Sequence, residues 1–168
     1  GFLETLREVT KEHDAVLIFD EVMCGFRASS GGAQKLYKIK PDLTCLGKIV
    51  GGGMPMAVFG GSAKIMSQVA PSGPIYQAGT LSGNPIAVTA GLATLSILQR
   101  DPTIFKSVED ATERLCEGYR KLAAEHGVPV QVQRVGSMFT IFFTDKPVLN
   151  FDDACACNND HFQTFFHY

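Results

Sequence analysis

The stretch Ala15–Glu21 (AVLIFDE) decides the fold, because five apolar residues in an unbroken run end at two carboxylates. Unbroken apolarity over so short a length predicts a strand covered on both faces, as in a mostly parallel sheet flanked by helices. The carboxyl ends of such strands are where open α/β sheets place their ligands. Asp20 is therefore the first candidate site residue.

Around this strand the hydrophobic periodicity predicts alternating strands and helices. We expect helices over residues 2–13, 63–69, 85–100 and 103–126, strands over 43–46 and 56–60, and a hairpin of strands over 128–133 and 137–143. Residues 25–35 are expected to be loop, and the apolar helix over 85–100 is expected to be largely buried. The fold class is therefore α/β. The pattern becomes strand-rich after residue 126, which predicts a large domain over 1–126 and the start of a smaller α+β domain over 127–168.

Composition excludes several classes of protein. The 168 residues are 45% hydrophobic and 19% charged, which rules out a disordered chain. Fifteen basic against seventeen acidic residues leave no excess of positive charge for nucleic acid. No apolar run approaches the roughly 18 residues that span a bilayer. We therefore expect neither nucleic acid nor membrane as a partner.

The five cysteines are odd in number and scattered, and Cys155 and Cys157 form a C-x-C pair without a nearby histidine. That is a poor zinc pattern, so no metal site is expected. Reduced thiols indicate an intracellular compartment, either the cytoplasm or a plastid stroma.

The two ends predict that this chain is a segment of a longer protein. It begins at Gly1 rather than Met, and it stops on the apolar cluster Phe165–Tyr168. We expect the segment alone to be inactive.

Lys48 is the second candidate. It follows the predicted strand over 43–46 and precedes three glycines, Gly51–Gly53. Burial at a strand end would favour the neutral amine, which attacks carbonyl groups. The glycines allow a large planar ligand to approach the backbone closely. A surface lysine beside a flexible loop is the alternative.

The third candidate is the turn Gly79–Pro85 (GTLSGNP), in which hydroxyls and small residues lead into a helix start. Backbone N–H groups, hydroxyls and the helix dipole suit a phosphate, although such residues are also ordinary helix caps. A carboxylate, a lysine and a phosphate turn together are the set that pyridoxal 5'-phosphate requires.

Two other classes stay open at this point. An apolar strand that ends in Asp-Glu also fits the Walker B pattern of magnesium-dependent nucleotide hydrolases. That interpretation needs a G-x-x-x-x-G-K-[ST] loop, but Ile49 follows Lys48 and Asp42 stands where the first glycine belongs. The other possibility is a non-catalytic remnant.

Several motifs resemble one enzyme family. Leu17–Val22 (LIFDEV) with Gly25–Arg27 (GFR) resembles the ring-binding segment of class III pyridoxal-phosphate aminotransferases. Pro41–Lys48 (PDLTCLGK) with Gly51–Pro55 (GGGMP) resembles their Schiff-base lysine segment. Within the class, Gly73–Pro85 (GPIYQAGTLSGNP) is most similar to the glutamate-1-semialdehyde aminomutases, since general ω-aminotransferases usually carry a His-Gly-Thr turn there.

The resemblance implies a fold type I transferase, active as a homodimer, that isomerises glutamate-1-semialdehyde to 5-aminolevulinate for porphyrin and other tetrapyrrole synthesis. Its catalytic residues would be Asp20, bonded to the pyridinium nitrogen, and Lys48, which condenses with the cofactor aldehyde and then moves protons. The cofactor would alternate between pyridoxal and pyridoxamine phosphate. An ordinary class III ω-aminotransferase with another amine donor is the alternative.

The resemblance also implies the remaining cofactor contacts. Val22 would pack on the ring face. Thr80 would donate to the phosphate, usually that of the neighbouring subunit, with Gly79 and Tyr76 nearby.

Overall fold

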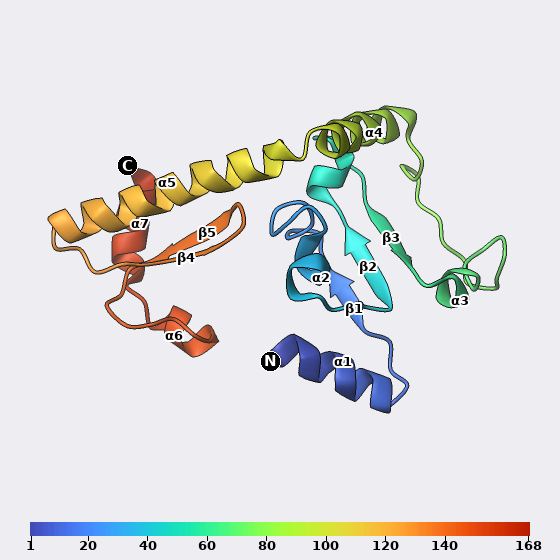
Figure 1. Ribbon diagram of the computed structural model, residues 1–168, viewed down its shortest axis with the longest axis horizontal. Coiled ribbons are helices and arrows are strands. Elements are labelled where there is room, and N and C mark those ends of the chain that lie inside the picture. Colours follow the sequence, from blue (N-terminus) through green and yellow to red (C-terminus); the bar gives the residue numbers. More distant parts are fainter. The chain divides into compact units, whose positions relative to one another are not determined.

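The computed structural model describes residues 1–168 and divides into two compact units, Gly1–Phe105 and Lys106–Tyr168. Each unit contains both helix and strand, which confirms the α/β class (Figure 1). No helix has the length and apolarity needed to cross a membrane. No group of three or more His, Cys, Asp or Glu side chains is placed to hold a metal ion.

A three-stranded sheet forms the centre of the first unit. Its strands are β1 (Ile18–Asp20), β2 (Leu43–Leu46) and β3 (Val58–Gly61), in that order across the sheet. β1 and β2 run parallel with Asp20 opposite Cys45, whereas β3 pairs antiparallel with β2 (Figure 1). All three strands lie within or next to the predicted ranges, and an antiparallel strand on a parallel pair is common in α/β folds.

Side chains alternate across the sheet at β1. Leu17, Phe19 and Glu21 are buried on one face, whereas Val16 and Ile18 are each 53% exposed on the other. Leu3 and Leu6 of helix α1 (Phe2–Glu12) line a small cavity together with residues of β1, among them Phe19 and Asp20. The expectation that both faces are fully covered is therefore wrong for this chain, because about half of the surface of Val16 and of Ile18 is exposed.

Four further helices complete the first unit: α2 (Gly32–Tyr37), the 3-10 helix η1 (Lys48–Gly51), α3 (Ala63–Met66) and α4 (Pro85–Arg100). The loop predicted over 25–35 ends earlier than expected, because α2 begins at Gly32. The bounds of α4 are as predicted, but only Ala87 and Gly91 are buried in it. Residues such as Ile86 and Leu92 are exposed, so the expected burial of α4 is wrong here.

Two glycines let α4 and η1 pack backbone to backbone. A Cβ on Gly91 would lie 2.5 Å from the carbonyl oxygen of Val50, and one on Gly52 would lie 2.5 Å from that of Ala90. Gly52 also has a φ of +59°, which disfavours a side chain on its own. The contact holds the turn after Lys48 against the helix that follows the Gly79–Asn84 turn.

The second unit contains α5 (Thr103–Glu125), β4 (Gln131–Val135), β5 (Met138–Phe142), α6 (Phe151–Cys155) and α7 (Asn159–His167). β4 and β5 form the predicted antiparallel hairpin, and Gly127 has the left-handed φ of +65° after α5. Phe165 of α7 packs against Tyr119 of α5 and Phe143, with ring centroids 5.9 and 5.7 Å apart. The aromatic C-terminal cluster therefore has a packing role.

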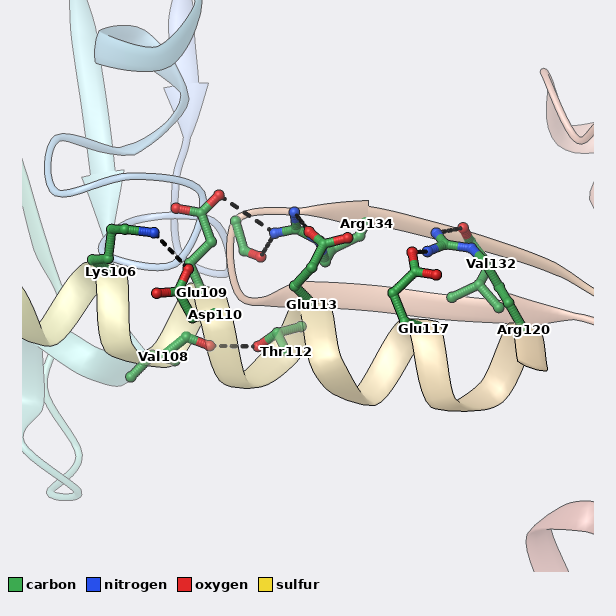
Figure 2. A network of polar contacts seen from close by, with 11 residues as sticks. Lys106, Val108, Glu109, Asp110, Thr112, Glu113, Glu117, Arg120, Val132 and Arg134 are labelled. Atoms are coloured by element: carbon green, nitrogen blue, oxygen red, sulfur yellow. Dashed lines mark hydrogen bonds and ion pairs between the residues drawn. The ribbon is translucent and has the colours of Figure 1, made fainter. Parts of the chain in front are cut away.

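Charged side chains join α5 to the hairpin (Figure 2). Arg134 of β4 pairs with Glu109 and Glu113, and Arg120 donates to the carbonyl of Val132. These contacts assign most of α5 to the second compact unit, which begins earlier than the predicted domain boundary after residue 126. The location of the domain boundary stays a prediction.

The glycine contact between α4 and η1 generates a test. We expect Gly91→Ala to lower the free energy of unfolding by about 1–3 kcal/mol, because the new methyl group overpacks against Val50. Gly118→Ala in α5 is the matched control, since a Cβ there meets nothing within 4 Å. That control should stabilise by up to about 1 kcal/mol through helix propensity. Urea denaturation measures both, and equal effects of the two substitutions would refute the packing argument.

Candidate active site

Asp20 and Lys48 lie at the ends of two neighbouring parallel strands, β1 and β2. Asp20 is the last residue of β1 and pairs with Cys45 of β2, and the backbone N–H of Glu21 extends this pairing by donating to the Cys45 carbonyl at 2.9 Å. Lys48 lies just beyond β2, after Leu46 and Gly47. Because parallel strands end at the same end of a sheet, both residues are placed at its carboxyl end.

Lys48 has an unusual backbone conformation. Its φ is +50°, in the left-handed region that non-glycine residues seldom occupy. Such a conformation costs on the order of 1–3 kcal/mol and is concentrated at functional sites. Its side chain is exposed, so the expected burial is wrong for this chain: the backbone turns into η1 immediately after the strand.

Asp20 and Val22 are joined by a local hydrogen bond. The backbone N–H of Val22 donates to Oδ1 of Asp20 at 3.0 Å, and the Asp20 side chain is exposed. Val22 packs against the residue before Lys48, because a Cβ on Gly47 would lie 3.1 Å from Val22 Cγ1. The ends of the two strands are thus in direct contact.

A groove of about 800 Å³ brings the third candidate segment to the same strands. It is lined by Val22, by the end of β2, and by Gly79, Ser82 and Asn84 of the turn before α4. Thr80, Tyr76, Asp20 and Lys48 do not line it, and Tyr76 is 84% exposed. Of the predicted cofactor residues, the structure therefore brings Val22 and Gly79 together. Ser82 was not among them, although its hydroxyl in the turn was a visible signal.

The turn from Gly79 to Asn84 can receive an anion. Oδ1 of Asn84 accepts from the N–H groups of Ile86 and Ala87 at 3.0 and 3.1 Å, which caps α4 as predicted. The hydroxyls of Thr80 and Ser82 are at the amino end of a 16-residue helix, whose dipole favours negative charge. By their chemistry, these hydroxyls suit the phosphate of the implied cofactor, and a carboxylate and a lysine suit its ring nitrogen and its aldehyde.

Glu21 differs completely from its neighbour Asp20. It is 1% exposed, and its carboxylate accepts from the N–H groups of Ala33 and Gln34 at 2.6 and 3.0 Å, from Nε2 of Gln34 at 3.3 Å and from Sγ of Cys24 at 3.1 Å. Burial alone would raise its pKa, but the hydrogen bonds from Gln34 and Ala33 hold the pKa of Glu21 below its usual value. Burial and then the Glu21 carboxylate raise the pKa of the Cys24 thiol to about 11, so the thiol stays protonated as a donor.

This environment argues against the nucleotide-hydrolase alternative. In that class the glutamate after the strand orients a water molecule. Here both oxygens of Glu21 are engaged with the start of α2 and with Cys24. The carboxylate is an internal helix cap and has no oxygen directed at a ligand.

The sequence and fold define a class. Residues 1–161 match the class-III aminotransferase family, and the chain belongs to that family.

Similar proteins within this family include aminomutases and a transaminase. The chain is 57% identical over 166 residues to a glutamate-1-semialdehyde 2,1-aminomutase of Desulfitobacterium hafniense, covering 99% of this chain and 38% of that protein. It therefore spans about two fifths of the length of that relative. A glutamate-1-semialdehyde-aminomutase from Pseudomonas aeruginosa, solved in complex with PMP, matches with a TM-score of 0.80 at 27% identity, over 95% of this chain and 37% of that one. A transaminase solved with PLP bound matches with a TM-score of 0.80 at 30% identity, over 92% and 36%.

The buried carboxylate predicts a pH dependence. The pKa of Glu21 is lower in the folded protein than its ordinary value of 4.5, so its stabilisation is complete above that pH and is lost as pH falls through the folded value. Glu21→Gln has no such titration. We expect the difference in unfolding free energy between the wild type and Glu21→Gln to be constant at neutral pH and to shrink below about pH 4.5. Urea denaturation across pH 3–7 measures it, and a difference that grows in acid would contradict the assignment.

Proposed function

We propose that this chain is a central to C-terminal part of a pyridoxal-phosphate-dependent aminomutase that converts glutamate-1-semialdehyde to 5-aminolevulinate. Two observations support the proposal. Asp20 and Lys48 follow neighbouring parallel strands at the same end of the sheet. A groove brings Val22 and the end of β2 together with the turn before α4. The aminomutase relatives support this substrate over that of a general aminotransferase.

The cofactor supplies an electron-withdrawing ring that stabilises negative charge on the substrate carbon carrying the amine. Asp20, which is exposed at the end of β1, would hold the proton of the ring nitrogen. Val22 would cover one ring face and exclude water from it. Thr80 and Ser82 would donate to the phosphate, with Gly79 leaving room for close approach and Tyr76 nearby.

Lys48 would bind the cofactor aldehyde through its amine and afterwards move a proton as general acid and base. In the net reaction the amine and the carbonyl group exchange places between two neighbouring carbons of the substrate. Substrate and product are isomers, so no external amine is consumed. A class III ω-aminotransferase with a separate amine donor is the alternative.

The proposal extends to the assembly of the protein. We propose a homodimer in which Thr80 serves the cofactor of the neighbouring subunit, without nucleic acid or membrane as a partner. The large domain would contain residues 1–126 and the small domain 127–168. The reported curated relative is bacterial, which favours the cytoplasm over a plastid stroma.

Lys48 provides the first test. Borohydride reduction of the cofactor-loaded protein at its native length should attach the label to Lys48, as read by peptide mapping. Lys48→Ala should lower turnover by about 10²–10⁴-fold, because the proton carrier is lost. Lys64→Ala, an exposed lysine of the same unit, is the control and should leave both labelling and turnover unchanged. A label on any other lysine would reject the assignment.

The substrate provides the second test. Glutamate-1-semialdehyde supplied without any amino acceptor should be converted over many turnovers, because donor and acceptor carbons belong to one molecule. Formation of 5-aminolevulinate is measured against enzyme concentration. Conversion that stops at one equivalent per site and resumes when a second amino acid or keto acid is added would establish the ω-aminotransferase alternative.

A further inference from the structure

We infer that Glu21 is a positioning residue, which holds Asp20 and Val22 in place from the opposite face of β1. The inference rests on the proposed function of these two neighbours. It concerns a residue that touches neither substrate nor cofactor and acts through the strand end that carries them.

Side chains alternate between the two faces of β1, so the adjacent residues Asp20 and Glu21 point in opposite directions. Leu17, Phe19 and Glu21 are buried on one face, and the side chain of Asp20 is exposed on the other. The Glu21 side chain therefore points away from the site and into the unit. Any force on Glu21 is transmitted to Asp20 and Val22 through a single peptide bond on each side.

Glu21 is anchored by both its backbone and its side chain. Its N–H donates to the Cys45 carbonyl and its carbonyl accepts from Gly25, each at 2.9 Å. Its carboxylate accepts four further hydrogen bonds, from Ala33, Gln34 and Cys24. The neighbours of Glu21 are joined to each other, since the backbone N–H of Val22 donates to the side chain of Asp20. Glu21 therefore anchors the segment between them, in addition to the pairing of Asp20 with Cys45 and the packing of Val22 on Gly47.

The pocket around Glu21 requires a carboxylate. Oε2 accepts from the N–H of Ala33 and from Cys24, whereas Oε1 accepts from the N–H and side chain of Gln34. A glutamine at position 21 would point its NH₂ group at one of the two backbone N–H groups in either orientation. Donor would then face donor inside the protein, where an unmade hydrogen bond costs most.

Gly32 is the second requirement of this pocket. A Cβ there would lie 2.1 Å from Oε2 of Glu21, and its φ is +68°. Gly32→Ala therefore displaces the carboxylate while Glu21 itself stays unchanged. It provides an independent way to disturb the same contact.

A matched control exists at the other end of the same strands. Oδ2 of Asp42 accepts from the N–H of Leu17 at 2.8 Å and from Arg7 at 2.9 Å, so it ties the amino ends of β1 and β2 together. Asp42→Ala should loosen the same two strands, far along them from the proposed site. A purely structural role for Glu21 predicts the same outcome for both kinds of variant.

The experiment compares Glu21→Gln, Gly32→Ala and Asp42→Ala in the protein at its native length. The first readout is the dissociation constant for pyridoxal 5'-phosphate from absorbance titration of the apoprotein. The second is hydrogen exchange of the Val22 amide in the apoprotein, which requires no cofactor. Unfolding free energies establish that the variants are folded and rank their destabilisation.

We expect Glu21→Gln and Gly32→Ala to raise the dissociation constant by about 10- to 100-fold, by analogy with the loss seen when outer hydrogen-bond partners of a metal site are removed. Both should also speed exchange at Val22, whereas Asp42→Ala should change the dissociation constant less than about twofold. Where either variant does not fold, Gln34→Ala removes one side-chain donor and should raise the constant about threefold.

Equal effects of the Glu21 and Asp42 variants on cofactor binding would overturn the positioning role and leave the proposed function intact. A wild-type protein that binds no pyridoxal phosphate would overturn the proposed function and, with it, this inference. The two failures are therefore distinguishable in one series of measurements.

Discussion

The parallel pairing of β1 with β2 is the constraint on which the site depends. Asp20 opposite Cys45 sets the register, and this places the acid after one strand and the lysine after the next at the same end of the sheet. A slip of one residue would turn Asp20 into the buried face and Glu21 outward. The packing of Val22 on Gly47 and of η1 on Gly91 then determines how the chain leaves that end.

The adjacent carboxylates of Asp20 and Glu21 show that the strand register determines which side chain is buried. Asp20 is exposed, whereas the buried Glu21 accepts hydrogen bonds from four donors, three at the start of α2 and one on Cys24. Burying a carboxylate is unfavourable unless hydrogen bonds compensate it, and here they hold its pKa below the ordinary value. The same interaction that stabilises α2 thus supports the segment that the proposed chemistry uses.

Local sequence signals predicted much of the fold. The start of α4 followed from Asn84 and Pro85, an N-cap and a first helical residue. β2 and the hairpin of β4 and β5 followed from apolar runs and turns. Burial was predicted less well. Ile18 and Leu92 are exposed, because apolarity shows that a side chain favours contact but not whether another part of the same chain supplies it.

The sequence by itself determined the identity of the chemical groups and their order: an acid after an apolar strand, a lysine before glycines, and hydroxyls before a helix. Only the tertiary structure decided which of these groups meet, because side-chain direction depends on strand register and turn geometry, which arise from long-range pairing. It brought Val22, Gly79 and Ser82 to one groove, gave Lys48 its left-handed backbone, and separated Glu21 from Asp20. The physical reason is that alternation along a strand sends neighbouring residues to opposite faces, and only packing decides which face is inside.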